Sequence, residues 1–545
     1  MPSVTVTINN KDYTYSKGIT LLDISKDFQK DYSNRIIIAI VDGTITELNQ
    51  KVLNNSTIEF YDVNSYVGNK VYESGVLFIL IKSFKDVLNS TIIVEHSIDK
   101  GIYIKSDKKI NDLIIEKIKN RMNELINKDI PIEKLLINRK DAINYYEKIN
   151  EKDKVNILKY NTNTNINLYK LDNIYDYFYN NLPISTGYIK DYKIDIIDDN
   201  SFVLSFPSIY SGKIEYNHHE KLFDAFEEYA RGCSILGINS ISDLNSRVSE
   251  GKINDLIFMA ETYQNNSLLK IAEKINNNKD IKIVLISGPS SSGKTTTSKK
   301  LQLFLKGFGI NPKTLSIDDY FVDREKTPKK EDGTYDFESI NAIKLDLFNS
   351  DLEKLLKGEE VKIPTYNFEL GKAEYKKEAT SLGEKDILII EGLHALNEEL
   401  TSSIERKYKY KIYLSPLTVL NLDNHNRMKT SDIRLLRRIV RDNRTRGYNA
   451  RDVINAWASV REGEEENIFP YQDTADIVFN TALLYEIGVL KVYVEPLLYV
   501  IKENEECYKF AIRLLNILKN VLPIPSDYIP KDSILREFIG NGYFE

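Results

Sequence analysis

Residues 288–295 read Gly-Pro-Ser-Ser-Ser-Gly-Lys-Thr. An apolar run, 281–286, precedes this stretch, and residues 296–307 after it have a helix-like composition. Two glycines let a loop wrap closely around phosphates with its N–H groups turned inward, while the lysine and threonine reach the terminal phosphates and Mg²⁺. The stretch therefore predicts a phosphate-binding loop between a strand and a helix, and with it a nucleoside triphosphate.

The loop also predicts individual binding residues. Lys294 is placed to act on the β- and γ-phosphates, and Thr295 to offer its hydroxyl to Mg²⁺. The loop residues expected to bind ATP are Gly288, Ser290, Ser291, Ser292, Gly293, Lys294, Thr295 and Thr296. A loop of this kind does not say whether the protein hydrolyses, signals or phosphorylates, so the residues that follow it decide the function.

Length and composition exclude several classes of protein. A chain of 545 residues exceeds the size of one hydrophobic core, so about three domains are expected. The net charge of -6 argues against a globally basic surface for nucleic acid, and two cysteines without a CxxC pair argue against a disulfide framework or a cysteine zinc site. No apolar stretch approaches the roughly 18 residues of a membrane span, so we expect a cytoplasmic protein that does not bind membranes.

Residues 1–62 have the pattern of a small α+β unit of the β-grasp kind. Asp42-Gly43 marks a tight turn within it. The expected elements are strands at 4–8, 12–15, 36–41 and 57–61 and a helix at 21–29. This unit resembles the TGS domain found at the start of threonyl-tRNA synthetases and in some regulatory GTPases.

A second α+β domain is expected over 63–255. Residues 72–78 and 94–103 resemble the second domain of threonyl-tRNA synthetases, in which a helix carrying HxxxH precedes a strand and a glycine-turn hairpin. Glu73 and Leu77 stand where the resemblance places the two histidines, and no CxxxH follows. The editing chemistry of that domain is therefore predicted to be absent, and nucleic acid, although conceivable as a partner of this half, is not expected.

From residue 256 to 545 the pattern predicts an α/β domain with a parallel sheet covered by helices on both faces. Apolar strands alternate there with longer amphipathic segments. The expected strands are 281–286, 314–317, 387–390, 410–414 and 477–480.

Two of these strands end in carboxylates. Asp318 and Asp319 follow the strand 314–317, at the sheet edge where ligands bind in such folds. A carboxylate there can accept a proton from an alcohol that attacks a γ-phosphate, although an Asx turn or a helix cap is the alternative. Glu391 ends the strand 387–390 and can hold Mg²⁺, or alternatively cap a helix. His394, on the loop that follows, is interpreted as structural.

Arginines recur at helical spacing between 434 and 441, opposite a face of leucine, isoleucine and valine. These arginines are Arg434, Arg437, Arg438 and Arg441. The pattern predicts a helix that packs on one side and presents guanidinium groups on the other, where they suit transferring phosphates. The alternative is a solvated basic face paired to acids such as those at 464–466.

Taken together, the motifs of 281–485 resemble the uridine kinase and phosphoribulokinase family in the same order. They are the phosphate-binding loop, Ser316-x-Asp-x-Tyr-Phe321, Tyr335-Asp-Phe-Glu338, Pro364-x-Tyr-Asn-Phe368, Ile389-Ile-Glu-Gly392, the arginine helix within 432–442, Arg446-Gly447 and Thr474-Ala-Asp-Ile-Val478. The resemblance implies transfer of the γ-phosphate of ATP, with Mg²⁺, to a ribose-type hydroxyl. It further implies that the arginine helix is a lid over the phosphates.

The resemblance also assigns residue roles. Catalysis is expected from Asp318 as the base, with Lys294 and Arg437. The sugar is expected to be gripped by Glu338 and the base contacted by Tyr366. The full expected sets are Asp318, Tyr320, Glu338, Tyr366 and Arg434 for the substrate, Thr295 and Glu391 for the metal, and Arg441 in addition to the loop for ATP.

One departure leaves the substrate open. Five residues after the tyrosine, uridine kinases carry a histidine that contacts the pyrimidine, whereas this chain has Gly371. A ribonucleoside is the expected substrate, and a sugar phosphate or pantothenate is the alternative within enzymes. A nucleotide-gated regulator that binds RNA or the ribosome is the alternative from another class. A GTPase is disfavoured because no N-K-x-D follows the loop, and a homo-oligomer is expected.

Overall fold

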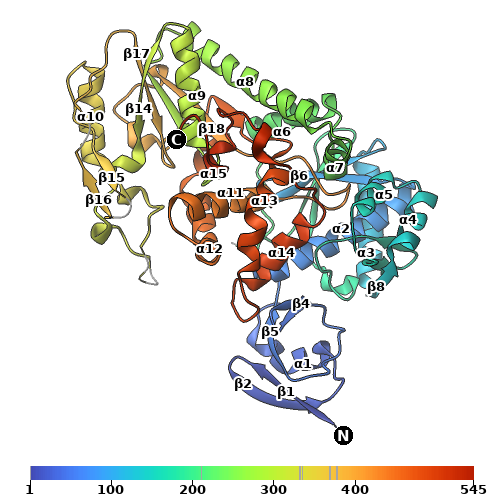
Figure 1. The fold of residues 1–545 in the computed structure, drawn as a ribbon. Helices are drawn as coiled ribbons and strands as arrows, with labels where there is room; N and C mark the ends of the chain where they lie inside the picture. The colour runs from blue at the N-terminus through green and yellow to red at the C-terminus, as the bar shows by residue number, and fades with distance from the viewer. Residues whose placement is uncertain (1, 210, 331–332, 334, 368–369, 376–377) are drawn as a thin grey trace.

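The computed structural model describes residues 2–545 except 210, 331–332, 334, 368–369 and 376–377. Phe368, quoted above, lies outside the described residues. In Figure 1 the chain forms a small lobe at its amino-terminal end, a middle part rich in helices, and a large part built on a five-stranded sheet. None of the helices described is long and apolar enough to span a membrane.

The small lobe is the predicted β-grasp unit. Its sheet has the order β2-β1-β5-β3-β4, with β1 parallel to β5 and the other pairs antiparallel. The Thr20 hydroxyl caps the helix by accepting a hydrogen bond from the Asp23 amide. Asp42 and Gly43 have φ of 47° and 78° and turn the chain between β3 and β4. The elements are β1 (Ser3–Ile8), β2 (Lys11–Ser16), α1 (Leu21–Phe28), β3 (Ile38–Val41), β4 (Thr44–Thr46) and β5 (Ser56–Tyr61).

The middle part is α+β, with a long buried helix, α2, against two antiparallel sheets. One sheet has the order β11-β12-β7-β6 and the other β10-β9-β8. Its elements are α2 (Tyr66–Leu88), β6 (Ile92–Ile98), β7 (Gly101–Ser106), α3 (Asp112–Asn127), β8 (Ile132–Asn138), α4 (Arg139–Lys148), α5 (Lys152–Lys159), β9 (Asn165–Leu171), β10 (Ile174–Asp176), β11 (Lys193–Ile196), β12 (Ser201–Ser205), α6 (Glu220–Ile235), α7 (Ile241–Ser249) and α8 (Ile253–Asn277).

The large part is a parallel sheet of order β14-β17-β13-β18-β19. Its strands are β13 (Ile283–Ser287), β14 (Asn311–Ser316), β17 (Asp386–Glu391), β18 (Lys409–Ser415) and β19 (Ile477–Asn480). The remaining elements are α9 (Lys294–Gly307), α10 (Leu345–Leu356), β15 (Thr365–Asn367), β16 (Lys372–Glu374), α11 (Thr430–Thr445), α12 (Ala450–Asn467), α13 (Glu486–Tyr499), α14 (Tyr508–Leu518) and α15 (Arg536–Ile539).

Alternate residues of the central strands face opposite sides of this sheet. Val284 and Ile286 join the core that contains α9, α11 and α13, whereas Ile283 and Leu285 join a second core with α10. The sheet is therefore buried on both faces by helices, as the continuous apolar strands predict.

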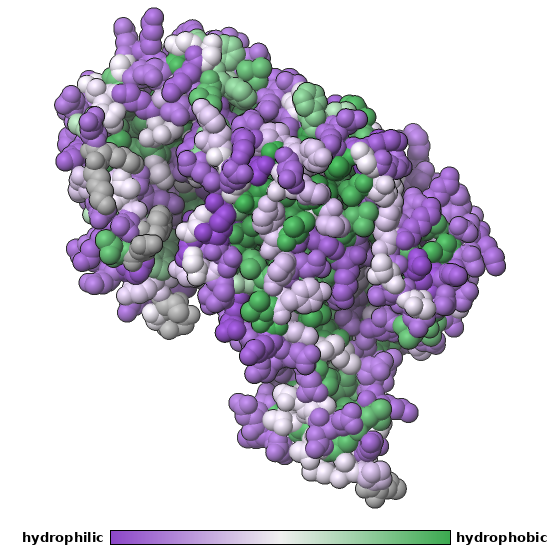
Figure 2. Space-filling view, in the orientation of Figure 1, coloured by the Kyte–Doolittle hydropathy of each residue, from purple (hydrophilic) through white to green (hydrophobic). Residues whose placement is uncertain are grey.

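The predicted domain limits at 62 and 255 remain predictions, because hydrophobic cores cross both. One core runs from Val4 to Phe206, and another joins residues 142–168 to the kinase-like part. Figure 2 shows hydrophobic side chains gathered over the centre of one face, around α13, where Val492 is half exposed.

Buried ion pairs connect the two halves of the chain. Glu73 of α2 pairs with Arg427 at 3.0 Å and with Lys429 at 3.2 Å, and all three side chains are buried. Lys154 of α5 pairs with Asp423 at 2.8 Å in the same way. The position that the resemblance assigns to an editing histidine therefore holds an acid that pairs with Arg427 and Lys429 of the other half and, at 2.7 Å, with Lys70 of its own helix.

Candidate active site

The phosphate-binding loop joins β13 to α9, and its glycines are required by close contacts. A Cβ on Gly288 would lie 2.2 Å from the carbonyl oxygen of Leu414. Gly293 has φ of 85°, a left-handed conformation that side chains rarely adopt. The Lys294 ammonium donates hydrogen bonds to the Gly288 carbonyl at 2.8 Å and the Pro289 carbonyl at 3.2 Å. The lysine thus lies along the loop that it is predicted to serve.

Strand pairing brings the two predicted acids to this loop. Ser316, the last residue of β14, lies opposite Glu391 in the sheet, so Asp318 two residues later is close to that carboxylate. Burial raises the pKa of Glu391 to about 7, and the charge of Asp318 adds to the shift while Lys294 opposes it. Burial also raises the pKa of Asp318, against the effect of Lys294. Lys294, Asp318 and Glu391 therefore form one electrostatic cluster.

The oxygen atoms near the loop suit a hard cation. Thr295 is exposed on the first turn of α9, and Glu391 is the nearby carboxylate. Among the described residues, no three His, Cys, Asp or Glu side chains form a group that could hold a metal ion. Mg²⁺ is commonly bound by one or two carboxylates together with water and substrate phosphates, so this set fits Mg²⁺ accompanying a nucleotide.

The adjacent acids Asp318 and Asp319 have different surroundings. Asp319 accepts a hydrogen bond from the Tyr366 amide at 3.2 Å and so positions that residue. The Tyr366 ring lies edge-on to Phe321, with ring centres 5.6 Å apart. Asp318 is therefore the acid of the pair that belongs to the phosphate side of the site.

Gly371 follows Tyr366 in a tight turn that excludes a side chain. Its φ is 67°, and a Cβ there would lie 2.8 Å from the Cβ of Arg324. The Arg324 amide donates a hydrogen bond to the Gly371 carbonyl at 2.8 Å. Arg324 also acts electrostatically on the Tyr366 hydroxyl. A guanidinium group therefore lies beside the position at which the resemblance expects a histidine, and sequence reasoning did not single it out.

Glu338 lies against α12, where Gly463 makes room for it. A Cβ on Gly463 would lie 2.5 Å from the Cβ of Glu338. Burial, followed by the charge of Glu464, raises the pKa of Glu338 to about 7. His394 is buried close to the Glu338 backbone, and burial lowers its pKa to about 4, so the imidazole is neutral at pH 7. Glu338 is thus a carboxyl group that changes charge near neutral pH.

Tyr320, predicted to contact the substrate, lies in the core. Its side chain is fully buried, packs against Phe348 and donates a hydrogen bond to Asp351 at 3.1 Å. The ring is therefore part of the core beneath the site, and its contact with the substrate stays a prediction.

The arginine helix, α11, corrects the prediction that all four arginines are presented on an open face. Arg434 and Arg437 are buried rather than presented on an open face. Arg434 pairs with Glu464 and donates to the Ser290 carbonyl at 2.9 Å. Arg437 pairs with Glu486 at 2.6 Å and donates to the Thr481 carbonyl at 2.8 Å.

The two buried arginines contact the phosphate-binding loop itself. Arg434 and Arg437 each pair with a buried carboxylate, and each donates to a loop carbonyl, that of Ser290 for Arg434 and that of Ser291 at 3.4 Å for Arg437. Both side chains therefore position the loop, and substrate binding by Arg434 and catalysis by Arg437 remain predictions. Arg438, which donates to the Ser290 hydroxyl at 3.0 Å, and Arg441, whose charge acts on Asp318 and Lys294, remain on the phosphate side.

Two carboxylates that contact the loop were not predicted from the sequence as site residues. Glu464, considered above only as a partner for a solvated face, is fully buried and accepts a hydrogen bond from the Ser290 amide at 2.9 Å. Glu537 of α15 accepts one from the Thr296 amide at 3.1 Å, and its charge acts on Lys294. The spacing between 537 and the loop carries no signal that could have predicted this contact.

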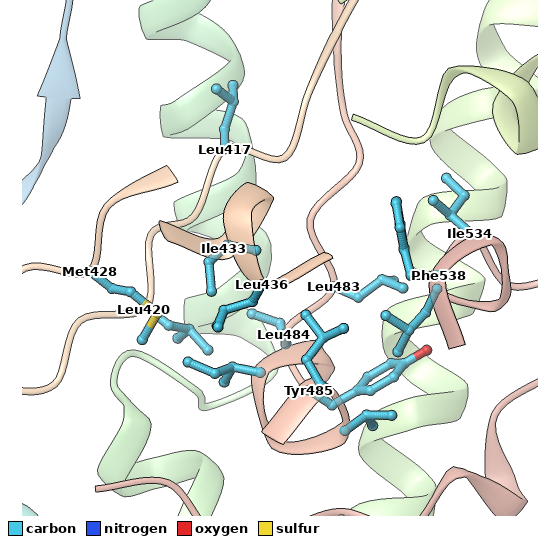
Figure 3. Close-up of a cluster of buried hydrophobic side chains, with 14 of the residues drawn as sticks. Leu417, Leu420, Met428, Ile433, Leu436, Leu483, Leu484, Tyr485, Ile534 and Phe538 are labelled. Atoms are coloured by element: carbon cyan, nitrogen blue, oxygen red, sulfur yellow. The ribbon is translucent and has the colours of Figure 1, made fainter. Parts of the chain in front are cut away.

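The segment around α15 is firmly packed beside the loop. A Cβ on Gly293 would lie 2.7 Å from Ile534. Ile534 and Phe538 are fully buried, and Figure 3 shows both gathered with Leu483 and Tyr485 in one hydrophobic cluster. Residues 534–538 are thus a constituent of the site.

Comparison with known proteins gives the following matches. Residues 283–484 match the model of the Phosphoribulokinase / Uridine kinase family. The uridine kinase of Staphylococcus epidermidis is 29% identical over 197 residues, which are 36% of this chain and 86% of that protein. The threonine–tRNA ligase of Clostridium kluyveri is 29% identical over 154 residues, 28% of this chain and 24% of the ligase. A solved structure of a possible uridine kinase from Bacillus stearothermophilus shares 20% identity over 37% of this chain and 89% of its own, with a TM-score of 0.25.

These matches confirm both resemblances inferred from the motifs. The carboxy-terminal half is similar to the phosphoribulokinase and uridine kinase family, and the amino-terminal region is similar to threonine–tRNA ligase. The chain spans about a quarter of the length of the ligases that it matches. The fold class, a kinase-like α/β part preceded by β-grasp and α+β parts, is likewise confirmed.

Proposed function

We propose that this chain, whose carboxy-terminal half is a phosphotransferase of the phosphoribulokinase and uridine kinase type, transfers the γ-phosphate of ATP to the 5′-hydroxyl of a ribonucleoside. The convergence of Lys294, Asp318 and Glu391 at the phosphate-binding loop carries the proposal. These residues supply a phosphate-binding cation, a base and a metal ligand at one place, as γ-phosphoryl transfer to an alcohol requires.

Asp318 acts as the base in the proposed reaction. Its carboxylate takes the proton of the hydroxyl as that oxygen forms a bond to the γ-phosphorus. The bond from the γ-phosphorus to the β–γ bridging oxygen breaks, and ADP leaves with the electron pair. Lys294 and Arg441 stabilise the charge on the transferring group. Mg²⁺, which Thr295 and Glu391 would hold, supplies further neutralisation of phosphate charge when bound.

The acceptor pocket is proposed to lie between Glu338 and Tyr366. Glu338 accepts hydrogen bonds from sugar hydroxyls, and the Tyr366 ring contacts the base. Arg324 beside Gly371 supplies the polar contact that a histidine would otherwise give. A guanidinium group donates only, so it pairs with carbonyl oxygens of a base.

Arg324 also supports a second candidate function. A guanidinium group binds phosphate in a bidentate manner, so the same residue could receive the phosphate of a sugar phosphate. A kinase acting on a phosphorylated sugar is therefore the alternative, and it differs from the first proposal in requiring an anionic acceptor.

A product screen tests the proposal. Purified full-length protein is incubated with ATP·Mg²⁺ and separately with uridine, cytidine, a purine nucleoside, deoxyuridine, pantothenate and sugar phosphates, and products are identified by mass spectrometry. We expect a nucleoside 5′-monophosphate and ADP. The Lys294→Ala variant should lose turnover, whereas Lys306→Ala, which removes an exposed lysine of the same helix, should retain it.

The screen separates the candidates. Turnover of a sugar phosphate and of no nucleoside moves the assignment to the second function. Turnover that survives in Lys294→Ala contradicts the role given to the loop in both functions.

A further inference from the structure

A cavity of about 170 Å³ lies between α6, α8 and β19, outside the site described above. It is lined by apolar side chains of β19 and the residues after it, and by polar side chains of α8. The volume far exceeds the roughly 10–15 Å³ that one water needs. The cavity can therefore hold an organic ligand.

Gln264 of α8 lines this cavity with unused hydrogen-bonding capacity. Its side chain is 5% exposed, and neither its amide nitrogen nor its amide oxygen has a partner among the residues that the structure describes. An unsatisfied buried polar group costs about 1–3 kcal/mol, so such groups call for a partner. A carboxamide offers a donor and an acceptor side by side, which match the N7 and N6 edge of adenine.

Aromatic side chains form the walls of the cavity. Tyr229 of α6 and Tyr263 of α8 both line it. A Cβ on Gly232 would lie 3.0 Å from the Tyr263 ring, so the absence of a side chain at this glycine leaves room for the ring. Tyrosine rings stack on the faces of nucleobases, as they do in single-strand binding sites.

Two lysines at the cavity, Lys270 and Lys274, are four residues apart on α8 and therefore adjacent on its surface. Both are exposed, and neither forms an ion pair with any residue in the described ranges. Glu228 is the acid at the same rim, which leaves a net positive charge there. The rim thus suits a ligand that carries an anionic group.

We propose that this cavity is an effector site for an adenine nucleotide, separate from the phosphate-binding loop. The base stacks between the tyrosines and pairs with Gln264, and its phosphate is held by Lys270 and Lys274. The proposal does not depend on which acceptor the chain phosphorylates.

The wall of the cavity is bonded to the phosphate-binding loop. The Tyr229 hydroxyl donates to the Ala482 carbonyl at 3.0 Å. The neighbouring Thr481 donates through its hydroxyl to the Ser292 carbonyl at 2.6 Å and accepts from Arg437 at 2.8 Å. A ligand that moves Tyr229 therefore acts on the loop through two residues, and it alters the affinity for ATP.

Titration calorimetry with AMP tests the site directly. AMP lacks the γ-phosphate of the donor, and the Lys294→Ala variant weakens binding at the loop, so AMP binding to that variant reports the cavity. We expect AMP to bind wild-type protein and Lys294→Ala alike, and IMP, which lacks the N6 donor, to bind at least about tenfold more weakly. Adenosine, without a phosphate, should also bind more weakly.

Variants of the cavity complete the test. Gln264→Leu should weaken AMP binding at least about tenfold. The exposed change Lys270→Ala preserves the fold and should weaken binding of AMP but not of adenosine, whereas Lys279→Ala, just beyond α8, should change neither. AMP at saturation should alter the KM for ATP in wild-type protein and in Lys279→Ala, but not in Gln264→Leu. Loss of AMP binding in Lys294→Ala, equal affinity for AMP and IMP, or unchanged affinity in Gln264→Leu would each overturn the proposal.

Discussion

Replacing Glu391 by glutamine tests whether the ionised carboxylate at the end of β17 lowers the free energy of unfolding. Burial raises its pKa from 4.5 to about 7, so its ionised form is disfavoured in the folded protein. One pKa unit corresponds to about 1.4 kcal/mol, and partial exposure reduces the effect through solvent screening. Keeping the group ionised therefore costs about 1–3 kcal/mol of folding free energy above pH 7.

The sign follows from the raised pKa. The stabilisation that protonation of Glu391 confers is fully present below pH 4.5 and is lost as the pH rises through about 7. Glutamine is neutral at every pH and similar in shape. Glu391→Gln should therefore raise the free energy of unfolding by about 1–3 kcal/mol at pH 8 and change it little at pH 5. The same variant should lose phosphotransfer, since it removes a metal ligand.

Urea unfolding without Mg²⁺ at the two pH values measures the effect. The single tryptophan, Trp457, lies under the Arg434 guanidinium at 5.3 Å and reports unfolding of the kinase-like part. Glu399→Gln, at an exposed acid nearby, serves as the control and should change stability at neither pH. An equal gain at pH 5 and pH 8, or a loss of stability at pH 8, would refute the reasoning.

Further predictions concern activity. Asp318→Asn should lower kcat at least about 100-fold with little change in ATP affinity, and a larger effect of Asp319→Asn would place the base one residue later. The kcat/KM of the wild type should fall as the pH drops through a value above the usual aspartate range, because burial raises the pKa of Asp318 and the base must be deprotonated. Arg324→Ala should raise the KM of the acceptor at least about tenfold while leaving the KM of ATP unchanged, and equal effects on both would contradict an acceptor role. Glu537→Gln should lower the KM of ATP about threefold or more, because the substitution removes a negative charge beside the Thr296 amide. A raised KM would show that the carboxylate assists ATP binding.

The sheet and the loop could be predicted from sequence because their signals are local. The five strands of the kinase-like sheet are predicted within a few residues of their observed limits, and the signal is plainest for the central strands β13, β17 and β18, which are largely buried apolar runs. The loop, Asp318 and Glu391 follow those strands directly. Residues fixed by their place at a strand end are the ones that a sequence specifies most plainly.

The arginine helix shows what sequence periodicity does not predict. Its spacing predicted correctly that four arginines share one face, but periodicity does not tell what covers that face. Glu464 and Glu486 bury Arg434 and Arg437, and both acids come from other helices. Glu537 and Arg324 were missed for the same reason, because only the tertiary fold brings them to the loop and to Gly371.

Likeness to two unrelated kinds of enzyme suggests parts that could be separated, but the buried charges at their junction argue against it. If the chain were divided near residue 255, Arg427 and Lys429 would lose their ion pairs with Glu73. Asp423 would lose its ion pair with Lys154. Separation would expose these side chains to water together with the hydrophobic core that joins residues 142–168 to the kinase-like part, and each Å² of apolar surface so exposed costs about 25 cal/mol. An isolated kinase-like half should therefore be less stable than the full chain and prone to aggregate. In evolution, deletion of the amino-terminal half would be selected against as a folding defect, whatever that half binds, because the two halves share one core.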